Sequence, residues 1–452
     1  MLKYKQKHNS FQHIFTIIPN GKSRYSLLAT KILNMKIYKF GGASVKDANG
    51  VRNLCEIVKQ SDDNLAVVIS AMGKMTNAFE LVVNSFFNHK SDVEHHIKAV
   101  VDYHEAIIAD LFGDQRDTID TLVADLYAQL DEIVSQRPSL SYDFEYDRIV
   151  SFGELLSTTI VATYLCHIGL PAEWVDVRKC IITDANHRDA NVDMEISLDL
   201  CREAFLNKQL TITQGFLAGT KTNQTTTLGR EGSDYTAAIL ANLLDAETVT
   251  IWKDVPGVMN ADPKLYDNVQ IIPVLSYKEA IELSYCGASV IHPKTVKPLQ
   301  NKRIPLHVKS FVHPAEPGSV ITNYTERLDL PPIYINKRNQ VLLSLTPRDF
   351  SFIAEERLSK IFGVLASYRL KSSLVQTAAI SFSLCVDYNE INFQRMIDEL
   401  KDEYEVLYNT DVELITIRHY TKEIVDKLIG ERLVFVEQRN RVTARFVVPA
   451  NQ

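Results

Sequence analysis

The sequence contains few cysteines, and their spacing argues against two kinds of small folded domain. Six cysteines are spread over 452 residues without any C-x-x-C pair, and they are Cys55, Cys166, Cys180, Cys201, Cys286 and Cys385. Neither a disulfide framework nor a zinc site has this pattern. It is typical of a protein in a reducing cytosol, so we expect a cytoplasmic location.

Long apolar runs and an excess of basic residues are also missing. The run from His13 to Ile18 is too short to span a bilayer, so we expect no membrane partner. Lysine and arginine number 49 against 56 for aspartate and glutamate, which gives a net charge of −7. Nucleic-acid binding requires a concentrated basic surface, so we expect no nucleic-acid partner. With 46% apolar residues, the chain can build two or three domains with their own cores.

Acidic residues are absent from the beginning of the chain. No aspartate or glutamate precedes Asp47, and the basic residues before Met35 are Lys3, Lys5, Lys7, Lys22, Arg24 and Lys31. Residues 1–34 also lack the periodicity and caps of a packed element. Three interpretations remain open for this extension: a start codon assigned too early with Met35 as the true start, a disordered tail, or a targeting segment.

The two most familiar nucleotide-binding motifs do not occur. No G-x-x-x-x-G-K-[ST] motif is present, because Thr16 stands where the leading glycine before Gly21-Lys22-Ser23 would be needed. No G-x-G-x-x-G motif is present either, so neither a P-loop nor a Rossmann dinucleotide site is supported.

A different glycine-containing segment, KFGGASVKD from Lys39 to Asp47, stands between an expected strand and an expected helix. It can bind phosphate through backbone N–H groups at the helix N-terminus and through Lys39. The alternative is a tight turn in which two glycines adopt positive φ angles.

The hydrophobic pattern predicts an α/β sandwich with a mostly parallel sheet. Unbroken apolar runs alternate with helical stretches from Lys36 to about Asn323, and the runs are 65–70, 211–216, 248–252 and 305–310. Two prolines after Leu330 indicate a boundary. Residues 332–452 then follow a β-α-β-β-α-β order, with expected strands that include 341–345, 379–387 and 412–418. This order predicts either a ferredoxin-like ligand-sensing module or a simple dimerisation module. We therefore expect a catalytic domain at 35–325 and a regulatory region at 332–452.

Three further clusters carry residues suited to recognition. In SFGELLST (151–158), Glu154 either caps a helix or faces an ammonium group. In TTTLGREGSDYTAA (225–238), Arg230 can bind a carboxylate, while Asp234 either caps a helix or contacts an ammonium group or an attacking group. An arginine and an aspartate so close together suit a zwitterion such as an amino acid. The loop in IWKDVPGVMNADPK (251–264) is either a ligand loop at the end of a strand or a solvated connector.

In combination, these segments resemble the aspartate kinases of the amino-acid kinase family. The resemblance rests on KFGGASV, SFGELLST, TQGF (213–216), TTTLGREGSDYTA, WKDVPGV with ADPK, and CGASVIHPKT (286–295). The region after the kinase part resembles the paired ACT regulatory domains of these enzymes, with 333–338 expected to pair with the C-terminal strands. The resemblance therefore implies an amino-acid kinase fold followed by tandem ACT units, the second of them truncated.

The resemblance also implies a reaction, namely ATP-dependent phosphorylation of L-aspartate to 4-phospho-L-aspartate. This is the first step of lysine, threonine and methionine biosynthesis. By position in the family motifs, the catalytic residues are Lys39 and Asp234. The residues for aspartate are Thr76, Glu154, Arg230, Gly232 and Ser233. The residues for ATP are Lys39, Gly41, Gly42, Ser44, Lys253, Asp254, Met259, Lys264 and Ser289. Mg²⁺ is expected only on the nucleotide, with no metal site of the protein's own.

Several positions depart from the family pattern. Glu231 and Ala43 replace a glycine and a hydroxyl residue, Ser289 replaces a lysine, and Met259 stands where an aromatic residue often stacks on adenine. We expect an active enzyme with altered ATP binding. In Lys371–Ala379, both acids of the lysine-sensing pattern are missing, so we expect weak or no inhibition by lysine and leave the effector of the ACT region open. We also expect a homodimer.

Two other interpretations compete with an aspartate kinase. One is another enzyme of the same fold, acting on glutamate, acetylglutamate or uridylate. The other is an amino-acid-binding regulatory protein with a degenerate kinase domain, suggested by Glu231 and Ser289. A dehydrogenase fused to a kinase is excluded by the length of the chain and by the missing dinucleotide motif.

Overall fold

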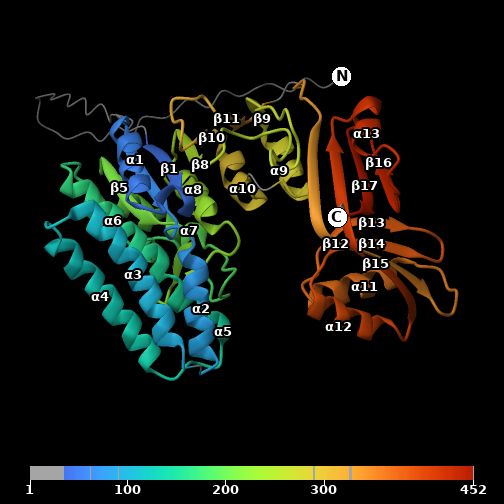
Figure 1. The fold of residues 1–452 in the computed structure, drawn as a ribbon, viewed down its shortest axis with the longest axis horizontal. Coiled ribbons are helices and arrows are strands. Elements are labelled where there is room, and N and C mark those ends of the chain that lie inside the picture. Colours follow the sequence, from blue (N-terminus) through green and yellow to red (C-terminus); the bar gives the residue numbers. More distant parts are fainter. Residues whose placement is uncertain (1–34, 62, 90, 289–290, 325–327, 451–452) are drawn as a thin grey trace, which may run out of the picture. The chain divides into compact units, whose positions relative to one another are not determined.

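A mostly parallel sheet of eight strands organises the first part of the chain in the computed structural model (Figure 1). The structure describes residues 35–450 except 62, 90, 289–290 and 325–327, so the interpretations of 1–34 lie outside the described residues. The strand order is β3-β5-β2-β1-β8-β10-β11-β9, and only β10 and β11 are antiparallel neighbours among these described strands. The strands are β1 Met35–Phe40, β2 Asn64–Ile69, β3 Glu173–Val175, β5 Leu210–Gln214, β8 Thr248–Lys253, β9 Val274–Ser276, β10 Leu306–Ser310 and β11 Ser319–Thr322.

The apolar runs in the sequence form the centre of this sheet. β2, β5, β8 and β10 coincide with the four predicted runs, and every residue of β2 from Leu65 to Ile69 is at most 2% exposed. Burial on both faces explains why the run in β2 shows no polar alternation. The predicted parallel α/β fold is confirmed.

Helices fill the connections between the strands. They are α1 Ala48–Lys59, α2 Met75–Phe87, α3 Val93–Phe112, α4 Asp117–Ser135, α5 Tyr142–Val150, α6 Phe152–His167, α7 Met194–Phe205, α8 Gly232–Leu243, α9 Tyr277–Cys286 and α10 Pro293–Lys302. Short 3₁₀ turns at Gly42–Val45 and Val177–Lys179 and a small sheet of β4 Ile182–Thr183, β6 Leu217–Thr220 and β7 Thr225–Thr227 complete this part. The stretch Tyr142–His167 has the length and hydropathy of a membrane span, but 83% of its most apolar window is buried, as in a core helix.

A second sheet, with six antiparallel strands, follows in the order β13-β14-β12-β15-β17-β16. Its strands are β12 Ile333–Pro347, β13 Ser372–Thr377, β14 Phe382–Asp387, β15 Tyr404–Arg418, β16 Val436–Arg439 and β17 Thr443–Pro449, with helices α11 Glu355–Ser367, α12 Glu390–Leu400 and α13 Lys422–Leu428. Ile333 pairs with Arg418 and Lys337 with Leu414, which confirms the predicted pairing of this segment with C-terminal strands.

Two strands of this sheet are longer than the sequence suggested. The segments predicted as separate strands at 333–338 and 341–345 are one 15-residue strand, β12, and 412–418 is the end of the equally long β15. The apolar pattern of the sequence stops at a polar stretch in the middle of β12. Register shifts near Lys337 and Gln340 let the strand continue through this stretch.

A buried ion pair connects α9 with the end of β15. The guanidinium of Arg418 donates to both carboxylate oxygens of Glu279, over 2.7 and 2.8 Å, and His419 Nε2 lies 3.0 Å from Glu279 Oε1. Burial alone would raise the pKa of Glu279, but His419 and Arg418 hold it at about 2. The bidentate geometry makes this a strong charge-assisted contact.

Replacing Glu279 should therefore destabilise the fold in a pH-dependent way. We expect E279Q to lower the free energy of unfolding by about 3 kcal/mol at pH 7, because it leaves a buried guanidinium without its counter-charge. The carboxylate is stabilising above its unfolded-state pKa of about 4.3, and this contribution is lost as the pH falls towards 2. The difference in unfolding free energy between E279Q and the unmodified protein, measured by urea unfolding, should therefore become smaller between about pH 4 and pH 2.

A neighbouring glutamate on the same helix provides the control. Glu282 accepts one bond of 3.2 Å from Arg418, and its side chain is 43% exposed. E282Q should cost less than about 1 kcal/mol. Equal losses for the two variants would contradict this account.

Candidate active site

The loop after β1 uses its glycines for close packing. Gly41 has φ −79°, Gly42 starts the 3₁₀ turn, and neither glycine is among the described residues with positive φ. A Cβ atom on Gly42 would lie 2.6 Å from the carbonyl oxygen of Ala71 and 2.7 Å from that of Gly73. The interpretation of this pair as a turn with two positive φ angles is therefore wrong, and Gly42 is needed for backbone approach.

Lys39, at the end of β1, is paired with a carboxylate at the start of α8. Lys39 Nζ lies 2.6 Å from Asp234 Oδ1, and Lys253 Nζ, at the end of β8, lies 3.5 Å from Asp234 Oδ2. Burial opposes the ionisation of Asp234, but the charges of Lys39 and Lys253 hold its pKa below the usual value. Three segments far apart in the sequence thus meet at one buried cluster of charges.

Glu154, in the first turn of α6, is buried beside this cluster. Its Oε1 accepts a hydrogen bond of 3.1 Å from the backbone N–H of Ala71, while Oε2 has no hydrogen-bond partner among the described residues. Burial raises the pKa of Glu154 to about 8. A carboxylate with one unsatisfied oxygen is suited to receive a cationic group from a ligand.

Glu231 immediately precedes α8 and has a left-handed backbone, with φ 53° and ψ 30°. Only glycine adopts this region without a steric cost, which explains why a glycine is usual here in the resembling family. Burial raises the pKa of the Glu231 carboxyl, and its Oε2 has no hydrogen-bond partner among the described residues. The substitution therefore adds both backbone strain and a poorly solvated acid.

These side chains line a cavity of about 480 Å³. Its lining includes eight of the predicted site residues, namely Lys39, Thr76, Glu154, Arg230, Gly232, Ser233, Asp234 and Lys253. Gly41, Gly42 and Ser44 belong to the loop that follows Lys39, and they are not among the lining residues. The residues that line this cavity carry both signs of charge, as a zwitterionic ligand requires.

A second cavity, of about 620 Å³, contains three other predicted residues. Asp254, Met259 and Lys264 line it, and Lys253 lines both cavities. Its walls are largely apolar and come from α9, from the loop after β8 and from Ile333–Asn336 of β12. Ser289 lies outside the described residues. No pattern in the sequence indicated that β12 contributes to this cavity.

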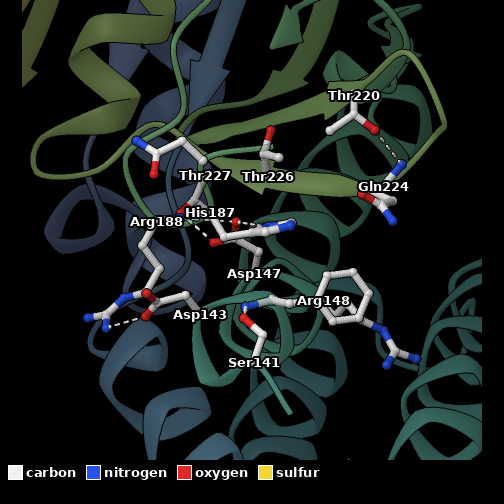
Figure 2. A network of polar contacts seen from close by, with 12 residues as sticks. Ser141, Asp143, Asp147, Arg148, His187, Arg188, Thr220, Gln224, Thr226 and Thr227 are labelled. Atoms are coloured by element: carbon white, nitrogen blue, oxygen red, sulfur yellow. Dashed lines mark hydrogen bonds and ion pairs between the residues drawn. The ribbon is translucent and has the colours of Figure 1, made fainter. Parts of the chain in front are cut away.

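Six further residues line the first cavity. Phe216, Gly229 and Glu231 lie in segments quoted above, whereas Ser70, Tyr146 and Arg188 were missed by sequence reasoning. Arg188 belongs to a polar network around the buried Asp147 (Figure 2). Asp147 accepts hydrogen bonds from the backbone N–H of Arg188 over 3.1 Å and from Thr227 Oγ1 over 2.7 Å, and His187 Nδ1 lies 2.8 Å from it. No motif in the sequence connects the HRD segment at 187–189 with α5, so no pattern could have indicated this contact.

Comparisons with known proteins identify the family. Residues 34–310 match the model of the amino acid kinase family. Over 357 residues the chain is 32% identical to lysine-sensitive aspartokinase 3 of Escherichia coli (strain K12), covering 78% of each protein. It is 30% identical over 380 residues to the chloroplastic aspartokinase 1 of Arabidopsis thaliana, covering 81% of this chain and 66% of that relative.

A solved structure extends the likeness to the three-dimensional fold. The structure of E. coli aspartokinase III in complex with aspartate and ADP has a TM-score of 0.77 and 28% identity, and covers 92% of this chain and 96% of that one. This coverage reaches beyond the family match into the six-stranded sheet. The chain belongs to the amino acid kinase family and, within it, to the aspartokinases.

The strain at Glu231 leads to a prediction on stability. We expect E231G to be more stable to urea than E231A by about 1 kcal/mol, because alanine keeps the cost of the left-handed backbone and glycine removes it. Both variants remove the carboxylate, so their difference isolates the backbone. An E231A variant as stable as E231G would show that the backbone at residue 231 carries no strain.

Proposed function

We propose that the chain transfers the γ-phosphoryl group of ATP to the side-chain carboxylate of L-aspartate, giving ADP and 4-phospho-L-aspartate. The observation that carries this proposal is the position of Lys253. It lines both the charged cavity and the largely apolar one, and it lies 3.5 Å from the same aspartate that pairs with Lys39. Two ligands in these cavities would meet beside three charged side chains.

The charged cavity is assigned to aspartate. Arg230 offers a forked donor for the α-carboxylate, and Glu154 and Asp234 flank the ammonium group. Thr76, Gly232 and Ser233 also line this cavity and are assigned to the same ligand. The unsatisfied oxygen of Glu154 gives this assignment its support, since a bound ammonium group would supply the missing partner.

The largely apolar cavity is assigned to the nucleotide. Lys253, Asp254, Met259 and Lys264 line it, and Ser289 is assigned to it by sequence alone. The transferred phosphoryl group would lie against Lys39, with Gly41, Gly42 and Ser44 beside it. The structure of the E. coli relative contains ADP, which supports a nucleotide site in this chain.

Mg²⁺ is assigned to the phosphates of the nucleotide. Within the described part of the chain, no group of three or more histidine, cysteine, aspartate or glutamate residues could hold a metal ion. Mg²⁺ is commonly bound by one or two carboxylates together with substrate phosphates and water, and Asp234 would be the carboxylate on the protein side. The ion would supply positive charge to the transferred group.

Catalysis then needs positioning and neutralisation of charge. The acceptor carboxylate is already a nucleophile at neutral pH, so no strong general base is required. Lys39 and Lys253 would offset the negative charge of the phosphoryl group as it passes between two anions. The chain's contribution is to hold the two ligands in line.

The six-stranded sheet is assigned to regulation and dimer formation. The strand β13 contains most of the segment that replaces the lysine-sensing pattern. In this strand, Ser373 accepts a hydrogen bond of 2.7 Å from Lys337. Lys337 also forms an ion pair of 2.5 Å with Asp387. Another ammonium group is poorly accommodated beside Lys337 and Lys371. We therefore propose weak or no inhibition by lysine and leave the amino-acid effector open. The cytoplasmic homodimer is proposed from the sequence alone.

Trapping the product with hydroxylamine tests the reaction. If L-aspartate is the acceptor, the purified chain with MgATP should form a hydroxamate from L-aspartate and none above background from L-glutamate. Equal products from both acids would indicate a different acceptor. ADP release without hydroxamate, or no turnover at all, would refute the proposal.

A further inference from the structure

Arg188 lines the acceptor cavity, although no assignment above gives it a task. It lies in the loop between β4 and α7, next to the buried Asp147 (Figure 2). Its backbone has φ 67°, so the chain holds a long, charged residue where glycine would be easier. This inference rests on the proposed function, since it concerns how the same cavity selects its acceptor.

The backbone of Arg188 is held firmly by its neighbours. Asp147 accepts a hydrogen bond of 3.1 Å from the Arg188 N–H and one of 2.7 Å from Thr227, so it ties the loop to β7. The loop also packs against the segment that carries Arg230, because a Cβ atom on Gly229 would lie 3.1 Å from the Arg188 carbonyl oxygen. The two arginines therefore come from segments that touch each other.

The side chain of Arg188 is oriented by an aromatic face and one carboxylate. Its guanidinium lies 4.4 Å from the ring centroid of Tyr146, which also lines the cavity, and Nη1 donates to Asp143 Oδ1 over 3.0 Å. Asp143 is the one hydrogen-bond acceptor of this side chain among the described residues. A guanidinium has five N–H donors, so most of its donors are available to a ligand.

The charges of the cavity indicate what that ligand group is. Lys39 and Lys253 are both close to Asp234, whereas Arg188 and Arg230 lie on the segments that touch at Gly229. Aspartate carries two carboxylates, and only the side-chain one is consumed in the transfer. The remaining carboxylate requires forked, cationic donors, which two arginines supply better than one.

We propose that Arg188 is a specificity-determining residue that binds the α-carboxylate of the amino-acid acceptor together with Arg230. Arg188 keeps its place on the face of Tyr146 and presents to the acceptor the N–H groups that Asp143 does not use. The competing explanation is that the Arg188–Asp143 pair only fastens the loop to α5. Under that explanation, either partner could be removed with the same effect.

Steady-state kinetics with two acceptors distinguish these explanations. The variants are R188Q and D143N, and the acceptors are L-aspartate and its α-amide, which keeps the side-chain carboxylate but lacks the α-carboxylate. For aspartate, R188Q should raise KM about 10- to 100-fold, the loss expected for one hydrogen bond to a charged group, with kcat changed far less. For the α-amide, R188Q should leave KM within about threefold of the unmodified protein.

The D143N variant is the matched control. The KM of D143N for aspartate should stay within about threefold, because this variant removes the negative charge of the loop contact and keeps the arginine. Equal increases in KM for D143N and R188Q, an unchanged KM in R188Q, or a loss that persists with the α-amide would each overturn the proposal. Thermal unfolding of both variants shows whether they fold.

Failure of the proposed function remains distinguishable from failure of this inference. If the unmodified chain forms no product from aspartate, the reaction itself is refuted. Titration calorimetry with aspartate then tests Arg188 separately, and R188Q should weaken binding by the same 10- to 100-fold factor, or about 1.4 to 2.8 kcal/mol. Unchanged binding in R188Q would overturn the inference.

Discussion

The buried pair of Lys39 and Asp234 is the contact on which the site depends. Their 2.6 Å separation joins the end of β1 to the first turn of α8, and hence the glycine loop to the loop that carries Arg230. Removing two charges from water is costly, and this cost is offset only if each has a close partner. Lys253 adds a second positive charge, so Asp234 remains ionised although it is buried.

The largely apolar cavity and the six-stranded sheet share the strand β12. Ile333–Asn336 line the cavity, and the same strand, β12, continues through the sheet to Pro347. The helix α9, which forms another wall of the cavity, is held to β15 by the pair of Glu279 and Arg418. A change in the register or twist of these strands would alter the walls of the cavity directly, without an intervening linker.

Much of the fold could be predicted because it depends on patterns among residues that are close together in the sequence. Apolar runs marked the buried strands, and the sequence motifs marked Lys39, Glu154, Arg230 and Asp234, which now line one cavity. The fusion of two expected strands into β12 could not be predicted, because pairing with β14 and β15 carries the strand through polar residues. Arg188 was missed because its place depends on Asp147, 41 residues away in the sequence.

The central claim is that Lys39 serves phosphoryl transfer and is not merely a partner that keeps Asp234 buried. Lys253 stays close to Asp234 when Lys39 is replaced, so K39M should fold. The most direct test is the kcat of K39M at saturating MgATP and aspartate, with thermal unfolding as the check on folding. A folded variant with kcat lowered by about 10²- to 10³-fold, the loss typical of one transition-state donor, supports the claim. A folded variant that keeps kcat within about tenfold would contradict it.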